Sequence, residues 1–172
     1  MAWTDLVREI QDFPEPGVLF RDVLPVMASV EALKEVLDQL YQLLRPLEIE
    51  AVLAPEARGF LIAAPLADRL GASLIPVRKP GKLPNPVFRE AYTLEYGENH
   101  LEVEVSDAIR GRRVVIVDDV LATGGTVAAC ARLADRLGAK VVGFAFLIEL
   151  KGLNGRNRLM SSHAPMMSLV AL

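Results

Sequence analysis

The chain has 172 residues, 52% of them hydrophobic, and its 19 basic and 22 acidic residues leave a formal net charge of −3. That length suits one domain over residues 1–172, and a mildly acidic chain has no overall attraction to the phosphates of a nucleic acid. No stretch reaches the ~18 consecutive apolar residues of a membrane span, and the first residues lack the pattern of a secretory signal. We therefore expect a cytoplasmic protein that acts on small molecules and binds neither nucleic acid nor a membrane.

Cysteine and histidine are scarce in this chain. The single cysteine, Cys130, excludes an intrachain disulfide. Together with His100 and His163 it shows no spacing typical of metal ligands. A transition-metal site held directly by side chains is therefore not expected.

The hydrophobic pattern predicts helices that alternate with strands. Apolar residues at helical spacing predict a helix from its N-cap Ser29 to Leu44, just before Pro46. Further along, the pattern predicts helices at 59–70 and 126–137, strands at 51–54, 73–77, 114–117 and 141–148, and a last strand near 166–167. Strands alternating with helices indicate an α/β fold, a mostly parallel twisted sheet with helices on both faces.

The middle of the chain is less regular. Residues 78–89, RKPGKLPNPVFR, are rich in proline and basic residues, and this composition predicts a long mobile loop without regular structure. Residues 91–95 and 101–105 flank a turn at Gly97 and predict a hairpin. Because Glu102 alternates with apolar residues, the second strand should have one face in water.

The stretch VVIVDDVLATGGT, residues 114–126, places two acids and a Gly-Gly turn between a buried strand and a helix. Glycines let main-chain N–H groups converge on an anion, and a helix N-terminus adds about half a positive charge. Residues 122–126 are therefore predicted to cradle a phosphate. The GxxxxGK[ST] and GxGxxG patterns are missing, which disfavours a nucleoside triphosphatase and a dinucleotide enzyme.

The two acids, Asp118 and Asp119, would repel a bare phosphate. They make sense if they face the hydroxyl groups of the ligand or a cation that travels with it. Successive side chains on a strand point opposite ways, so we expect the strand to break here and let both acids reach one ligand. A capped turn without a ligand is the alternative, but the whole pattern favours an enzyme that acts on a phosphorylated ribose.

This stretch resembles the phosphoribosyl pyrophosphate motif of the type I phosphoribosyltransferases. Four further segments follow the order and spacing of the adenine phosphoribosyltransferase family: FPEPGVLFRDV (13–23), EARGF (56–60), RKPGKLP (78–84) and LEYG (94–97). The resemblance implies a purine salvage enzyme that transfers 5-phosphoribose from phosphoribosyl pyrophosphate to N9 of adenine and gives AMP and pyrophosphate. It also implies Mg²⁺ held mainly by the donor, and a homodimer in which residues 78–89 or the N-terminal segment meet the partner.

The same resemblance implies a hood over the base site, contributed by residues 1–28 and 149–165. A mobile lid of loop and hairpin, residues 78–96, would exclude water from a donor that is liable to hydrolysis.

The resemblance also assigns roles to individual residues on the donor side. The 5-phosphate and ribose would be bound by Asp118, Asp119, Ala122, Thr123, Gly124, Gly125 and Thr126. The pyrophosphate would be bound by Arg58, Lys79 and Lys82. Departure of pyrophosphate leaves an oxocarbenium-like charge on the sugar, which the nearby carboxylates would stabilise.

On the base side, adenine would be contacted by Leu19, Phe20, Arg21 and Leu150, with Phe20 against the purine and backbone groups of its neighbours reading the Watson–Crick edge. Glu95 is implied as a third catalytic residue that contacts the N7 and N9 side of adenine and manages its proton. Tyr96 is implied as a lid contact.

Three other readings stay open at this point. A sister transferase for guanine, hypoxanthine or a pyrimidine is the nearest, although residues 13–23 and LEYG argue against it. A regulator that senses phosphoribosyl pyrophosphate usually carries a nucleic-acid-binding domain, for which this chain has no room. A purely structural turn is the third.

Overall fold

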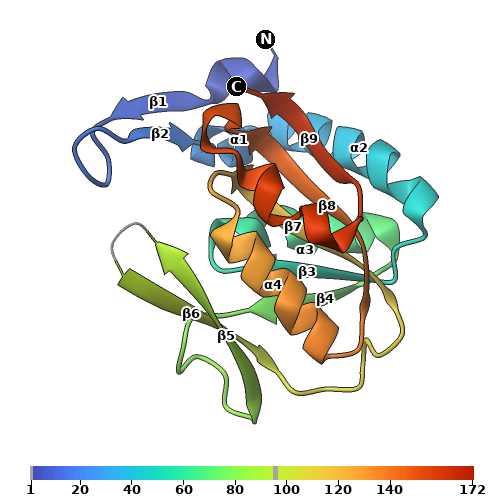
Figure 1. Cartoon of the computed structure of the whole chain (residues 1–172). Helices are drawn as coiled ribbons and strands as arrows, with labels where there is room; N and C mark the ends of the chain where they lie inside the picture. The colour runs from blue at the N-terminus through green and yellow to red at the C-terminus, as the bar shows by residue number, and fades with distance from the viewer. Residues whose placement is uncertain (1, 95–96) are drawn as a thin grey trace.

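The computed structural model describes residues 2–94 and 97–172, so the predicted site residues Glu95 and Tyr96 lie outside the described residues. Within these residues, a five-stranded sheet has the order β4-β3-β7-β8-β9, and all neighbours in it are parallel (Figure 1). The strands are β3 (Ala51–Pro55), β4 (Ser73–Val77), β7 (Arg113–Leu121), β8 (Lys140–Glu149) and β9 (Met166–Ala171). The predicted α/β fold is confirmed.

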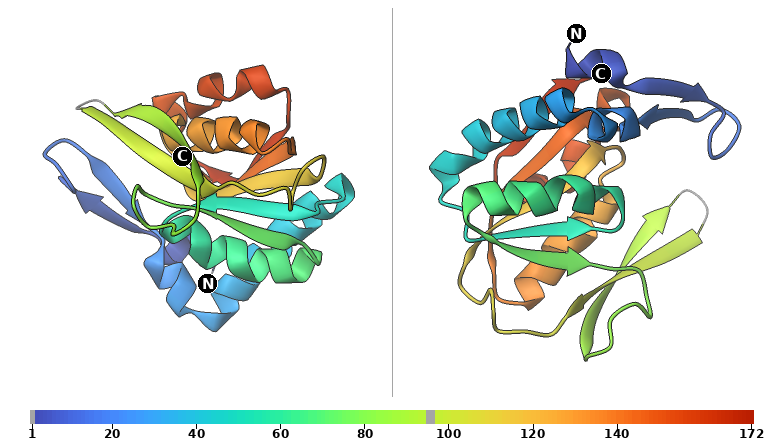
Figure 2. Two further views of the ribbon diagram at one scale, coloured as in Figure 1. Left: turned by 90° about the horizontal axis from the view of Figure 1, so that it is seen from below. Right: turned by 180° about the vertical axis from the view of Figure 1, so that it is seen from behind.

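Helices cover both faces of this sheet (Figures 1 and 2). They are α1 (Leu24–Ala28), α2 (Val30–Leu44), α3 (Arg58–Leu70) and α4 (Gly125–Arg136). Val115 and Val117 of β7 pack with α1, α2 and α3, whereas Val114 and Ile116 pack with α4. Because successive strand residues point to opposite faces, a strand between two helical layers is apolar at every position.

The helix ends follow the local signals in the sequence. The Oγ of Ser29 accepts a hydrogen bond from the N–H of Ala32 at 3.2 Å, as an N-cap does. Gly71 at the end of α3 and Gly138 after α4 have φ angles of 63° and 72°. Glycine reaches this left-handed region at little cost. Helix α3 ends at Leu70 as predicted, and α4 ends at Arg136, one residue before the predicted end.

Outside the sheet, the described residues form two antiparallel hairpins that project on the same side of the molecule (Figure 1). The first joins β1 (Arg8–Gln11) to β2 (Leu19–Asp22), and the second joins β5 (Val87–Leu94) to β6 (Gly97–Glu104). Short 3-10 helices complete the chain: η1 (Trp3–Leu6), η2 (Arg45–Leu47), η3 (Lys151–Leu153), η4 (Gly155–Arg158) and η5 (Met160–Ser162). The segments expected to form the hood thus comprise η1, the first hairpin, α1 and η3 to η5.

The prediction for the middle of the chain is wrong in two respects. Strand β5 begins at Val87, inside the segment expected to lack regular structure. Glu102 is only 2% exposed, although its strand was expected to turn that face to water. Its carboxylate accepts hydrogen bonds from Arg89 and from the N–H of Gly81, so the preceding loop folds over it. Alternation in one strand could not reveal this cover, because the partners come from another segment.

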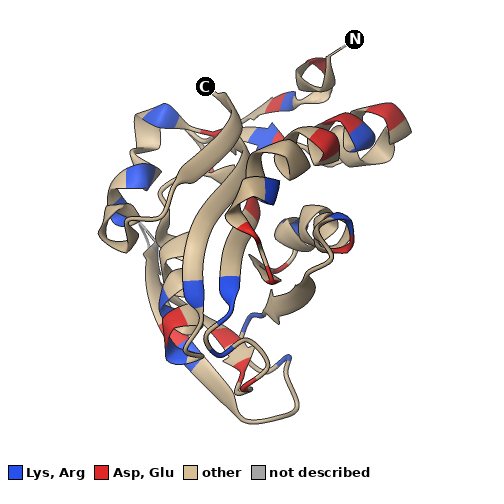
Figure 3. Ribbon diagram, turned by 90° about the vertical axis from the view of Figure 1, so that its right-hand side faces the viewer, with Lys and Arg blue, Asp and Glu red and all other residues tan. Residues whose placement is uncertain are grey.

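None of the helices in residues 2–94 and 97–172 combines the length and apolar composition needed to cross a membrane. Lys and Arg are interspersed with Asp and Glu over the side of the molecule seen in Figure 3.

The cap of α2 gives a test of the fold. Replacing Ser29 with Ala leaves the N–H of Ala32 without its side-chain partner, so we expect the free energy of unfolding to fall by about 1 kcal/mol. Urea denaturation followed by circular dichroism measures the change. Ser161→Ala, at an exposed position, is the control and should be neutral; equal stabilities of the two variants would contradict the cap.

Candidate active site

A cavity of about 570 Å³ lies at the carboxyl ends of β3 and β7, beside the first turns of α3 and α4. Ligands bind at this edge in open α/β sheets. Most of the residues predicted from the sequence line it together: Phe20, Arg21, Arg58, Lys79, Asp118, Asp119, Ala122, Thr126 and Leu150. They come from five segments that are far apart in the chain.

A second, smaller cavity of about 60 Å³ adjoins the same loop and is lined by the remaining loop residues, Thr123, Gly124 and Gly125. One water molecule takes about 30 Å³ in the liquid, so this space suits a small group of a few atoms. The first N–H groups of α4 have no partner within the helix, and an anion there would satisfy them.

The backbone of this loop needs glycine at a defined point. Gly124 has a φ angle of 82°, and a Cβ added to it would lie 2.5 Å from the carbonyl oxygen of Gly155. A residue with a Cβ would be strained at this φ angle and would clash with Gly155, so the position requires glycine. The loop is therefore packed from behind by the segment that follows β8.

The two acids lie within β7, which continues to Leu121 and pairs with β8 as far as Glu149. The expectation that the strand breaks at Asp118 and Asp119 is therefore wrong. Both carboxylates nevertheless line the same cavity, because it wraps around the end of the strand. Each carboxylate also accepts a backbone N–H from the next residue at 2.9 Å, which fixes its direction.

Arg58, the first residue of α3, joins the base side of the cavity to the acid side. Its Nε lies 2.6 Å from Oδ2 of Asp119, which is 2% exposed. Its guanidinium carbon also lies 4.9 Å from the ring centroid of Phe20, within the range of a cation–π contact. Phe13 packs edge-on against the same ring at 5.1 Å between centroids.

The surroundings of Asp118 favour its protonated form. Burial raises the pKa of Asp118 well above its ordinary value, and the neighbouring Asp119 raises it further, while Arg58 opposes both effects. A Cβ added to Gly59 would lie 3.1 Å from Oδ1 of Asp118, so the start of α3 closes over this carboxyl. The fold keeps an acid here at a cost in stability, as is common at functional sites.

Two predicted residues are not brought to the described lining of the cavity. Lys82 is exposed in the loop between β4 and β5, and Leu19, also exposed, is not among the residues that line the cavity. The roles of all the predicted site residues, Glu95 and Tyr96 included, stay predictions.

Several lining residues were missed, above all Glu56, Tyr92, Leu101 and Leu153. Glu56 accepts hydrogen bonds from Nε of Arg78 at 2.6 Å and from the N–H of Lys79 at 3.1 Å. Burial alone would raise the pKa of Glu56, but these bonds outweigh it and hold the pKa below its ordinary value. Glu56 opens the EARGF segment and could have been noticed there, whereas the three apolar or aromatic residues carry no local signal.

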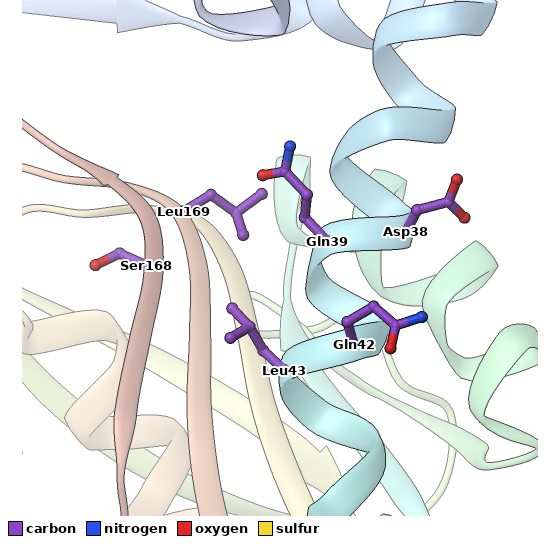
Figure 4. A pocket seen from close by; sticks show the side chains of 6 residues that line it. All are labelled: Asp38, Gln39, Gln42, Leu43, Ser168 and Leu169. Carbon is purple, nitrogen blue, oxygen red and sulfur yellow. The ribbon is translucent and has the colours of Figure 1, made fainter.

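Another cavity of similar volume lies between α2 and β9 (Figure 4). Its lining in the described chain is Asp38, Gln39, Gln42, Leu43, Ser168 and Leu169, none of which is a lysine or an arginine. The cavity at the end of β7 has Arg21, Arg58 and Lys79 in its lining, so a phosphorylated ligand fits it better.

The comparisons with known proteins agree with this geometry. Residues 22–166 match the phosphoribosyl transferase domain family. Over 166 residues the chain is 50% identical to an adenine phosphoribosyltransferase of Synechococcus sp., and the alignment covers 96% of each protein. The chain belongs to the adenine phosphoribosyltransferase family. The resemblance noted in the sequence is thereby confirmed.

Solved structures of the family have the same fold. An adenine phosphoribosyltransferase from Thermoanaerobacter pseudethanolicus superposes with a TM-score of 0.94 at 44% identity, covering 98% of this chain and 97% of that one. The enzyme from Saccharomyces cerevisiae, crystallised with adenine and an imino-altritol bisphosphate, gives a TM-score of 0.91 at 34% identity, covering 97% and 96%.

The raised pKa of Asp118 predicts a pH-dependent effect of its removal. Because the fold favours the protonated form, this group supports stability below its ordinary pKa of 3.8 and loses that support as pH rises through the folded-state value. We expect Asp118→Asn to raise the free energy of unfolding at pH 7, with a gain that shrinks towards zero at pH 3.8 and below. Urea titrations at both pH values measure it. The exposed Asp107→Asn should change little at either pH, and a wild type more stable than Asp118→Asn at pH 7 would contradict the prediction.

Proposed function

We propose that this chain transfers 5-phosphoribose from phosphoribosyl pyrophosphate to N9 of adenine and releases AMP and pyrophosphate, a reaction of purine salvage. The observation that carries the proposal is the convergence of the phosphate loop, two acids and an arginine-faced aromatic ring on one cavity. Its support is the membership of the family, whose members at about half identity are named for this activity.

The donor lies with its 5-phosphate in the small cavity, where the main-chain N–H groups of residues 122–126 and two threonine hydroxyls donate to it. The hydroxyl groups of the ribose donate to the carboxylates of Asp118 and Asp119. This arrangement puts the anomeric carbon between the acids and Phe20.

In the reaction, the bond from the anomeric carbon to pyrophosphate breaks and its electron pair leaves with pyrophosphate. The sugar carbon gains positive charge, and the carboxylate of the buried Asp119 stabilises that charge. The lone pair of N9 then forms the new bond, and N9 loses its proton. We assign that proton to Glu95, with Tyr96 as a lid contact.

The leaving group carries several negative charges and needs cations. Arg58 and Lys79 face the cavity, and Lys82 lies on the exposed loop beyond them. The oxygens of pyrophosphate compete with Asp119 for Arg58, so donor binding draws the guanidinium towards the leaving group. Asp119 is then free to face the sugar.

Magnesium fits this site only as a companion of the donor. Among the described residues, no three carboxylate, histidine or cysteine side chains gather in a way that could hold a metal. Asp119, the most buried acid of the site, is already paired with an arginine. Mg²⁺ carried by the donor would supply positive charge against the leaving group, beside Arg58 and Lys79.

Adenine lies against Phe20, with Leu150 on the other side. Strand β2 pairs only with β1 in the described part of the chain, so one of its edges has free backbone groups. Near Leu19 and Arg21 these groups match the 6-amino donor and N1 acceptor of adenine. A 6-oxo purine offers the opposite pattern and would leave buried groups unpaired, a heavy penalty.

The assembly of the protein is proposed from its resemblance to the family. We propose a homodimer in which the loop between β4 and β5 or the N-terminal segment meets the partner. Exposed Leu74 on the edge strand β4 and exposed Leu61 on the neighbouring α3 support a contact on that side. A cytoplasmic location stays a prediction.

The direct test incubates the purified protein with labelled adenine, phosphoribosyl pyrophosphate and Mg²⁺, in parallel with guanine and hypoxanthine. We expect AMP and one equivalent of pyrophosphate from adenine, at a kcat/KM at least about 10⁴-fold above that for the 6-oxo purines. Product from guanine alone would support a sister transferase. Binding of the donor without turnover would support a sensor, and either result would overturn the proposal.

The role of Asp119 can be tested separately. Asp119→Asn keeps its size but removes the charge that faces the sugar, so kcat should fall about 10²- to 10³-fold with a smaller change in KM for the donor. Steady-state kinetics measure both values. Asp107→Asn, which changes an exposed acid paired with Arg110, is the matched control; a rise in KM with kcat unchanged would limit Asp119 to binding.

A further inference from the structure

An ion pair between Arg156 in η4 and the buried carboxylate of Glu149 holds the segment that follows β8 to the sheet. Nε and Nη2 of Arg156 each lie 2.6 Å from a different carboxylate oxygen of Glu149, which is 7% exposed. Nη1 of Arg156 donates to the carbonyl of Met166 at 3.0 Å, and the hydroxyl of Ser168 donates to Glu149 at 2.8 Å. A bidentate pair with further bonds on both partners holds the guanidinium in a single orientation.

Both partners are charged at neutral pH. The hydrogen bonds from Arg156 outweigh burial and hold the pKa of Glu149 below its ordinary value. The same bonds raise the pKa of Arg156. Neither side chain lines the candidate site, so the pair does not touch the substrates directly.

On the Glu149 side, the chain leads straight into the base side of the cavity. Leu150 follows Glu149, lines the cavity, and donates its N–H to the carbonyl of Leu121 at 2.9 Å. Leu153, in η3, lines the same wall. The position of Glu149 therefore sets this wall relative to the end of β7.

On the Arg156 side, the chain leads to the back of the phosphate loop. Gly155 precedes Arg156, and a Cβ added to it would lie 2.3 Å from the carbonyl oxygen of Ala122. A Cβ added to Gly124 would in turn lie 2.5 Å from the carbonyl oxygen of Gly155. The backbone of Gly155 is in direct contact with the backbone of the phosphate loop, residues 122–126. A shift of η4 must therefore shift the loop.

We propose that Glu149 and Arg156 are positioning residues whose ion pair fixes the base-side wall and the phosphate loop relative to each other. The two ends of one nucleotide, its base and its 5-phosphate, are thereby held at a set separation. The proposal rests on the proposed function for the identity of that nucleotide, AMP.

Binding measurements test the pair without relying on turnover. Isothermal titration calorimetry gives the Kd of the wild type and of Glu149→Gln for adenine, ribose 5-phosphate, AMP and pyrophosphate. We expect AMP to bind about 10- to 100-fold more weakly to Glu149→Gln, since small displacements of positioning groups have effects of that size. Pyrophosphate should change within about twofold, because Arg58 and Lys79 lie on other segments and distant sites do not couple.

Two further variants separate the steps of the argument. Arg156→Lys keeps the positive charge but cannot make the two parallel hydrogen bonds to Glu149. It should therefore weaken AMP binding as Glu149→Gln does. Gly155→Ala should weaken ribose 5-phosphate and leave adenine unchanged. Gly152→Ala is its matched control, because a Cβ there meets nothing within 4 Å, and it should bind all four ligands as the wild type does.

A loss of stability alone must also be recognised. Leu40→Ala truncates a fully buried side chain of α2 and should lower Tm while leaving the ligand affinities of the folded protein unchanged. The proposal is overturned if Glu149→Gln behaves like Leu40→Ala, or if Gly155→Ala binds ribose 5-phosphate normally. If the wild type binds AMP but makes none from adenine, the proposed function fails while these affinities still decide the role of the pair.

Discussion

The arrangement of the site depends on the parallel pairing of β7 between β3 and β8. Ala51 of β3 lies opposite Val114, and Val114 lies opposite Val141 of β8. Because parallel strands end at the same edge, this register brings the first turns of α3 and α4 together. Arg58 and the phosphate loop begin those two helices, so they meet although more than sixty residues separate them in the chain.

Two arginines, Arg58 and Arg156, balance the charge of buried acids around this edge of the sheet. Asp119 is neutralised by Arg58, while burial and Asp119 raise the pKa of Asp118. Such an acid pair costs stability in the free protein, and on the proposed function that cost is offset when a cationic sugar carbon develops beside it. The pair of Glu149 and Arg156, in contrast, is satisfied within the protein, and its effect on the site passes through the backbone.

Some features of the middle of the chain were open to sequence reasoning and others were not. The hairpin around Gly97 follows from local alternation and a turn. Burial of Glu102 does not, because its partners lie in other segments: Arg89 in the neighbouring strand β5 and Gly81 in the loop before it. The continuation of β7 to Leu121 also depends on another segment. Strand β8 pairs with β7 as far as Leu121, and the residues of β7 alone do not show how long β8 is.

The sequence by itself determined the parallel α/β fold, the ends of the main helices and the family, because hydrophobic period, capping residues and the VVIVDDVLATGGT stretch are local patterns. Only the tertiary structure decided that Arg58 bridges Phe20 and Asp119, that Glu56 lines the cavity, and that Gly155 backs the phosphate loop. Each of these depends on the distance between segments far apart in the chain. That distance is set by the packing of helices on the sheet, which no local pattern encodes.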